Sequence, residues 1–368
     1  MTSDPFTGSY YPARRSACAD GTMGVMARPV GPRPALLALG PHAGAHRVAA
    51  RVAISVLVPL LVLDAANRLE WSLYAVFGAF TSLYGRERVD LARLRLQVTA
   101  GAWQVASVTL GALVACSAHR GWVAVPAAAV VALLAAYASE TQGWHPPGSL
   151  FQVFAVGAVA TVPAGIGDVV PALMVSAAGA IFAMAVGNVG AVVRRARRTA
   201  PLERNVMIGG SSAGAPSYAL QAAIGVLLAG TVANAFDIGR PYWAMVAAVV
   251  PLMARAVPAQ LVRGAHRLIG TGVGLLAAWA LLSVSMPTLP ALLVVTLLQA
   301  AAELTVGRNY ALALVFITPL ALMMGQLVRP VPTGALIADR ALETMIGVVI
   351  GLLVGLTWWR VTRHQQRK

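Results

Sequence analysis

From Arg47 onward the chain is a succession of apolar stretches, several near the ~20 residues that a helix needs to cross a bilayer. Of the 368 residues, 58% are hydrophobic and only 11% are charged, whereas about a quarter of an ordinary soluble domain is charged. A soluble enzyme of this size is excluded because the chain has too few ions for its surface. Disorder is excluded because disordered chains are poor in apolar residues. The sequence therefore predicts an all-α membrane protein.

Twelve transmembrane helices are expected, in two sets of six. The first set is expected at roughly 48–67, 70–84, 96–117, 121–139, 149–166 and 169–192. The second set is expected at roughly 217–236, 241–256, 264–285, 289–306, 309–326 and 340–359. Around them we expect a flexible cytoplasmic tail (1–46), a six-helix repeat (47–198), a cytoplasmic linker (199–215) and a second repeat with a short cytoplasmic C-terminus (216–368).

The basic residues support this topology. Lys and Arg total 28 against 13 Asp and Glu, a balance that could indicate nucleic-acid binding. However, the arginines form short clusters between apolar runs, and the expected spans put 23 of the 28 on one side and five on the other. Cytoplasmic loops of membrane proteins carry such an excess, so both termini are predicted to be cytoplasmic, in a bacterial inner membrane.

The two sets share one plan. Leu73-Tyr74-Ala75 opens the second span of the first set as Tyr242-Trp243-Ala244 opens that of the second set. Asp168 and Asp339 open the last span of each. Because each set has an even number of spans, the repeats are expected to be parallel, as in a pseudo-dimer.

The second set resembles the fusaric-acid-resistance (FUSC-like) family of membrane proteins. The resemblance implies export or passage of small organic anions, since the family includes aromatic-acid exporters and is related to plant malate-type anion channels. It covers most of 217–360 and, more loosely, 48–195. It is carried by Pro241-Tyr242-Trp243-Ala244, Arg263 with Arg267-Leu268-Ile269-Gly270, Tyr310 with Phe316-Ile317-Thr318-Pro319, and Arg340-Ala341-Leu342-Glu343-Thr344.

Five residues are candidates for binding the anion. The second and eighth spans are the shortest, and paired short spans indicate a central site in transporters. Tyr74 and Trp243 in these spans are expected to stack on the substrate, unless they form an interfacial aromatic belt. Arg95, Arg263 and Arg267 lie at inner mouths and suit carboxylate binding, although the bias of cytoplasmic loops toward positive charge also explains them.

Two glutamates end apolar runs at matching places. Glu140 and Glu303 are costly in hydrocarbon, so they are expected either to pair or to carry protons. The functional hypothesis is proton-coupled export. The alternative is a structural ion pair with Arg95 or Arg267 across the bundle.

Other patterns are interpreted as structural. Arg340 and Glu343, three residues apart, are expected to pair near the outer end of the last span. No metal site or cofactor is expected, because the two cysteines and six histidines show no ligand spacing within a helix. Glycines spaced four apart predict close helix packing in lipid; these are Gly270, Gly274, Gly347 and Gly351.

The leading hypothesis is a secondary transporter that exports small organic, mainly aromatic, anions. The alternatives are a passive anion channel and a membrane scaffold without flux. An enzyme is disfavoured, because no nucleophile and base are paired. The expected partners are the anion and the lipid bilayer but no nucleic acid, and homo-oligomerisation stays open.

Overall fold

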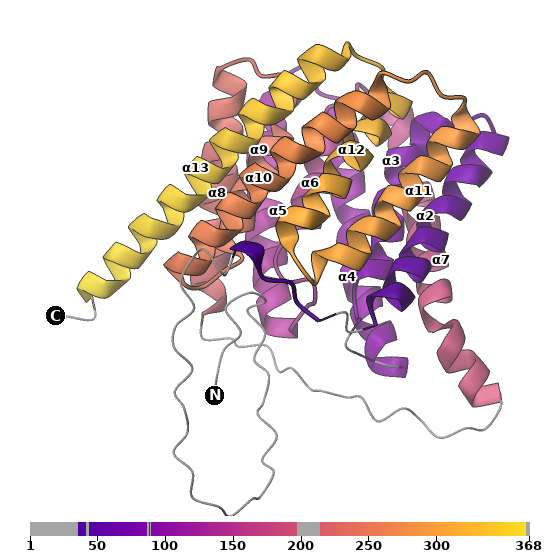
Figure 1. The fold of residues 1–368 in the computed structure, drawn as a ribbon, viewed down its shortest axis with the longest axis horizontal. Coiled ribbons are helices and arrows are strands. Elements are labelled where there is room, and N and C mark those ends of the chain that lie inside the picture. The colour runs from indigo at the N-terminus through magenta and orange to yellow at the C-terminus, as the bar shows by residue number, and fades with distance from the viewer. Residues whose placement is uncertain (1–35, 42–43, 87, 89, 197–213, 366–368) are drawn as a thin grey trace, which may run out of the picture.

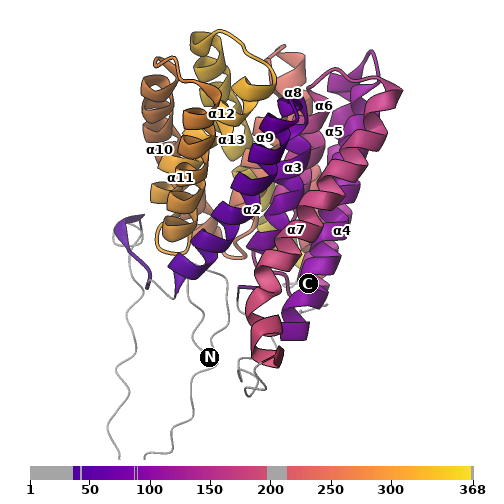
Figure 2. The ribbon, with the colours of Figure 1, turned by 90° about the vertical axis from the view of Figure 1, so that its right-hand side faces the viewer.

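The computed structural model describes residues 36–41, 44–86, 88, 90–196 and 214–365. The predicted tail up to residue 35 and the predicted linker up to residue 213 lie outside these residues. The described chain is helical and contains no strand. Figure 1 shows the helices side by side in one bundle, and Figure 2 shows α10–α12 on one side of it and α4–α7 on the other.

A helix overlaps each predicted span, and α4 and α13 begin six and seven residues before the predicted starts. The first six are α2 (Ala45–Ala65), α3 (Ser72–Ala79), α4 (Asp90–Ala115), α5 (Arg120–Gln142), α6 (Leu150–Ala160) and α7 (Val169–Ala196). The second six are α8 (Ala215–Ala235), α9 (Tyr242–Leu252), α10 (Val257–Leu282), α11 (Thr288–Val306), α12 (Tyr310–Val328) and α13 (Thr333–Gln365). Short 3₁₀ turns, Leu69–Trp71 and Phe80–Leu83, flank α3.

Nine helices of the described chain are long and apolar enough to cross a membrane. The exceptions are α3, α6 and α9. The 11 residues of α9 extend only about 16 Å, against about 30 Å for the hydrocarbon core. The count of twelve crossings therefore stays a prediction.

The short helices are enclosed by the others. All 11 residues of α9 are buried, as are seven of the eight in α3. Non-helical backbone is tolerated at membrane depth only where protein or a water-filled cavity surrounds it. Enclosure therefore explains how chain segments too short to span alone are accommodated at the centre of the bundle.

Helix neighbours recur between the halves of the chain. In the first half α4 packs against α6 and α7, and α3 against α7; in the second half α10 packs against α12 and α13, and α9 against α13. The contacts between the halves also correspond. The fourth helix of each half packs on the first helix of the other half, α5 on α8 and α11 on α2.

Glycine allows the tightest of these contacts. On α13, a Cβ atom at Gly347 would collide with the carbonyl oxygen of Ala244 in α9, and one at Gly351 with that of Ala248. On α10, a Cβ atom at Gly274 would lie 2.7 Å from the carbonyl oxygen of Leu314 in α12. A Cβ atom at Gly270, also on α10, would collide with the carbonyl oxygen of Ala311 in α12. At these glycines the two helix backbones are in contact, because glycine has no side chain to separate them.

Gly347→Ala is expected to destabilise the fold by about 1–3 kcal/mol, because α13 must move away from α9. The measurement is the midpoint of thermal unfolding in detergent, followed by helical circular dichroism. The control is Gly272→Ala, since that glycine lies in the middle of α10 with nothing within 4 Å of an added Cβ. Equal midpoints for the two variants would contradict the packing role.

Candidate functional site

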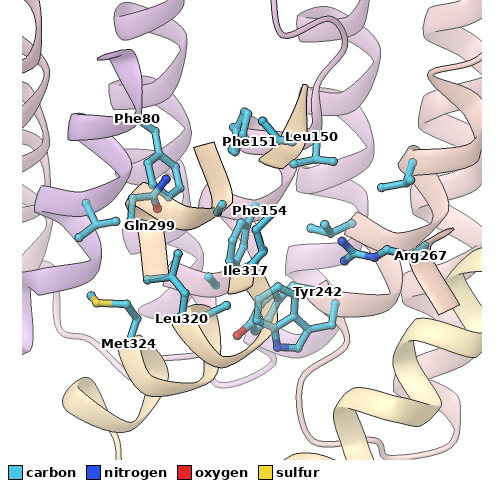
Figure 3. A pocket seen from close by; sticks show the side chains of 18 of the residues that line it. Phe80, Leu150, Phe151, Phe154, Tyr242, Arg267, Gln299, Ile317, Leu320 and Met324 are labelled. Carbon is cyan, nitrogen blue, oxygen red and sulfur yellow. The ribbon is translucent and has the colours of Figure 1, made fainter. Parts of the chain in front are cut away.

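A cavity of about 610 Å³ lies between the two halves of the bundle. It is bordered by α2, α3 and α6 of the first half and by α9 to α13 of the second. Figure 3 shows side chains from both halves converging on it. Residues beside the arginine-rich loops, such as Arg308, and residues at the opposite end, such as Arg329, both border it. The end with Arg308 is called the inner end below.

Aromatic rings form much of the cavity wall. The ring of Phe154 lies at the junction of the two halves, 5.0 Å from that of Phe77 and 4.7 Å from that of Trp243, centroid to centroid. Tyr242 stacks on Phe154 at 5.9 Å. Such a wall offers planar apolar faces to a ligand.

Arg267 is the buried cation of the cavity. It lies on α10 with 3% of its surface exposed and borders the cavity (Figure 3). Its Nη1 donates to the hydroxyl of Tyr310 at 3.1 Å, whereas its Nε and Nη2 have no partner in the described chain. A buried guanidinium without a counter-ion is unfavourable, and a bound anion with two acceptor oxygens would satisfy it.

The other predicted binding residues divide into two groups. Trp243 and Arg263 border the cavity. Tyr74 is buried in α3 but does not border it, and Arg95 is exposed on α4 outside it. Tyr74 lies on a face of α3 that does not border the cavity, because residues three, four and seven apart share one helix face. On α3 and the turn after it, that face consists of Leu73, Val76, Phe77 and Phe80.

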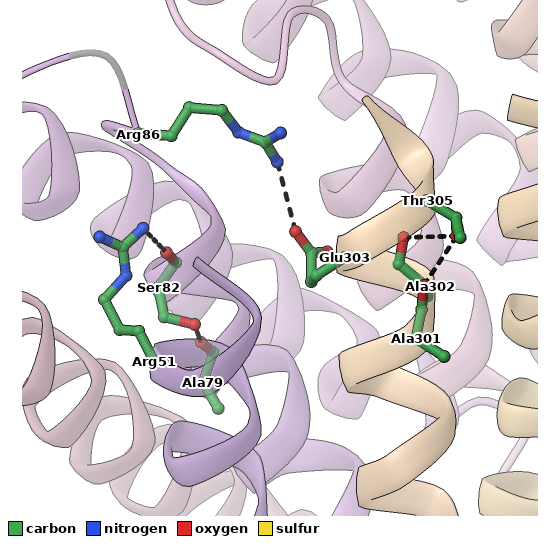
Figure 4. Close-up of polar contacts among 8 residues, drawn as sticks. All are labelled: Arg51, Ala79, Ser82, Arg86, Ala301, Ala302, Glu303 and Thr305. Atoms are coloured by element: carbon green, nitrogen blue, oxygen red, sulfur yellow. Dashed lines mark hydrogen bonds and ion pairs between the residues drawn. The ribbon is translucent and has the colours of Figure 1, made fainter. Parts of the chain in front are cut away.

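Both predicted glutamates form ion pairs, with partners other than those expected. Glu140 on α5 pairs with Arg255, and Glu303 on α11 pairs with Arg86 at 3.3 Å, as Figure 4 shows. Each pair joins one half of the chain to the other. Arg86 and Arg255 follow the short helices α3 and α9, and neither was identified from the sequence. The signal was available, since both lie twelve residues after the aromatic residue that opens the short span.

Arg340 and Glu343 are fully buried, and the ion pair expected from their spacing is not among those of the described chain. The Arg340 guanidinium instead lies 3.7 Å from the ring centroid of Trp243. Glu343 accepts a hydrogen bond from the backbone N–H of Arg240 at 2.8 Å. Arg340 and Glu343 are called the charged layer below. Through the contact of Arg340 with Trp243, this layer lies directly behind the aromatic wall of the cavity.

His145 borders the inner end of the cavity, in the loop between α5 and α6. Burial, and after it the charge of Arg86, lowers the pKa of His145 to about 4. Its imidazole is consequently neutral at physiological pH and adds no cation to the site. Within the described ranges, no three His, Cys, Asp or Glu residues cluster as a metal site would require.

The comparisons agree with the resemblance expected from the second half. Residues 228–354 match the family described as "Fusaric acid resistance protein-like". An uncharacterized membrane protein of Bacillus subtilis (strain 168), YvaC, is 31% identical over 143 residues, which are 39% of this chain and 23% of that protein. The chain thus spans less than a quarter of that relative's length in the match. No solved structure matches.

The two ion pairs should contribute unequally to stability. The side chains of Arg86 and Glu303 are 20% and 8% exposed, whereas that of Arg255 is 62% exposed. Glu303→Gln leaves a largely buried cation and should cost about 3 kcal/mol or more. Glu140→Gln is the matched control and should cost under about 1 kcal/mol, because water hydrates Arg255. Thermal unfolding in detergent measures both, and a larger loss for Glu140→Gln would contradict this ranking.

Taken together, the apolar helices and the match over 228–354 identify a multi-pass membrane protein whose second half is similar to the fusaric acid resistance family.

Proposed function

We propose that this protein is a secondary transporter that exports small organic anions through the cavity between its halves. The observation that carries the proposal is Arg267, a buried guanidinium at the cavity wall with two nitrogens that find no partner among the described residues. A carboxylate can accept two parallel hydrogen bonds from such a group. The aromatic and aliphatic remainder of the wall favours an anion with a planar apolar body.

The proposed architecture is two parallel six-helix repeats, with both termini cytoplasmic in a bacterial inner membrane. The recurring neighbours of α4 and α10, and the exchanged contacts between the halves, support the repeats. The short helices α3 and α9 meet the cavity near the middle of the bundle, as central segments of repeat-built transporters do. The excess of arginine at the inner end supports the orientation.

The proposed repeats differ in charge. Gln97 on α4 donates to the backbone of Tyr84, and Gln260 on α10 donates to that of Ala254, so the two glutamines are counterparts. Seven residues further along, α4 carries Gln104 and α10 carries Arg267. The anion is therefore proposed to bind to the second half, which is the half that matches the family.

A second pair of positions, on α7 and α13, also differs in charge between the proposed repeats. Ser176 on α7 donates to the carbonyl of Ala172, and Thr344 on α13 donates to that of Arg340. Alanine thus occupies the counterpart position of Arg340 in the first half. Under this correspondence the buried Arg340 has no charged counterpart in the first half.

Proton coupling is proposed at Glu303, which borders the cavity, rather than at Glu140, which does not. Glu303 and Arg86 form an ion pair at 3.3 Å, so protonation of Glu303 would remove the charge that attracts Arg86. A passive anion channel is the second candidate, because the cavity has residues of both ends of the bundle on its border.

Arg267→Gln is expected to lower the uptake of radiolabelled benzoate into inside-out vesicles about tenfold or more, since a charge-assisted hydrogen bond is lost. Uptake in this orientation corresponds to export. The matched control is Arg95→Gln, because Arg95 is exposed outside the cavity and should leave uptake near wild type. Wild-type uptake by a correctly inserted Arg267→Gln protein would overturn the proposal.

Glu303→Gln is expected to abolish the dependence of uptake on a proton gradient. Vesicles that are acidic inside should accelerate benzoate uptake by the wild type, since protons then leave as the anion enters. The neutral amide cannot carry a proton, so the variant should respond to the concentration gradient alone. If the wild type ignores the pH gradient but its currents follow voltage, the passive channel is the correct reading.

A further inference from the structure

A short segment before α2 lies across the inner mouth of the cavity. Residues 36–41, called the strap, run beside the start of α12 although they are more than 260 residues from it in sequence (Figure 1). The backbone N–H of Gly40 donates to the carbonyl oxygen of Arg308 at 2.8 Å. Ala38 of the strap borders the cavity together with Gly307 and Arg308. The strap is thus part of the cavity's inner border.

Side chains at the mouth donate hydrogen bonds to the strap. The carbonyl oxygen of Leu36 lies 3.0 Å from His266 Nε2 and accepts from Asn309 Nδ2 at 3.0 Å. Because a carbonyl oxygen only accepts, His266 must carry its proton on Nε2. Asn309 Nδ2 also donates to Ala38 at 3.2 Å. Arg308 Nε also donates to the carbonyl oxygen of Gly40 at 3.4 Å, so four side-chain contacts at the mouth end on oxygens of the strap.

The orientation of Asn309 is fixed independently of the strap. This residue caps the N-terminus of α12, and its Oδ1 accepts from the backbone N–H of Leu312 at 3.1 Å. The amide nitrogen must then face the mouth. If the strap left, the N–H groups of Asn309 and His266 would remain there as unpaired donors, next to Arg267 on α10.

We propose that these donors form an entrance subsite for a carboxylate, and that the strap is its intramolecular competitor. The carbonyl oxygens of Leu36 and Ala38 occupy the positions that the oxygens of the anion would take. An anion at this subsite lies beside the path to Arg267, so docking of the strap and entry of the anion are mutually exclusive. The inference rests on the proposed function for the chemical class of the ligand, but the docking of the strap does not.

Two substitutions release the strap from opposite sides. A Cβ atom at Gly40 would lie 2.8 Å from the backbone oxygen of Gly307, so Gly40→Val should displace the strap while leaving every mouth donor intact. Asn309→Asp keeps the capping oxygen for Leu312 but removes both N–H donors. Gly334→Ala is the matched control for Gly40→Val, since nothing lies within 4 Å of a Cβ there.

The experiment measures the reactivity of a thiol introduced by Ala38→Cys, in full-length protein that also carries Cys18→Ser and Cys116→Ser. Open membranes are treated with a maleimide, with and without benzoate as the probe. Gly40→Val and Asn309→Asp should each raise the labelling rate about tenfold, because lost hydrogen bonds shift the strap toward the released state. Saturating benzoate should raise the rate in the protein with an intact strap, and Gly334→Ala should leave it unchanged.

Two results would overturn the inference. Equal labelling rates in Gly40→Val, Asn309→Asp and the unmodified strap would show that the strap does not close the mouth. Faster labelling in both variants without any effect of benzoate would show that the strap moves but does not compete with a carboxylate. Benzoate uptake is measured in parallel. Absent uptake together with benzoate-dependent labelling would refute the proposed transport while retaining the entrance subsite.

Discussion

The structure depends on the cost of placing polar groups where no water can reach them. In hydrocarbon every backbone N–H and C=O must be satisfied inside the protein, which restricts the chain to helices. That requirement also explains the layout of the bundle. The long helices α2, α4, α5, α7 and their second-half counterparts face outward, and the short α3 and α9 are enclosed, where their ends do not meet lipid.

The same cost decides how the interior charges are used. Glu303 pairs with Arg86 across the two halves, and Glu140 pairs with Arg255. Both pairs connect the halves, and the more buried pair of Glu303 and Arg86 is expected to contribute more to stability. Arg267 differs from these pairs, because two of its nitrogens have no partner in the described chain and the residue borders a cavity with mostly apolar walls. A buried charge without a counter-ion destabilises the folded protein, but it can bind an anion. The proposed function therefore centres on Arg267.

Much of the fold was predictable because hydropathy in a bilayer is a one-dimensional signal. A helix overlaps each expected span, and the motifs around Trp243 and Arg267 indicated the family that matches 228–354. The candidate site was predictable only in part. Trp243, Arg263 and Arg267 border the cavity, but Tyr74 and Arg95 do not. Sequence places a residue on a helix, whereas the rotation of that helix within the bundle decides which face meets the cavity.

The sequence alone determined that this chain is helical and membrane-embedded, where its apolar segments lie and which half carries the family's motifs, because each of these follows from local composition and order. Only the tertiary structure decided which charges meet, that Phe77 rather than Tyr74 faces the cavity, and that the strap crosses its mouth. These are contacts between segments far apart in the chain. They depend on how whole helices pack against one another, and no local pattern records that.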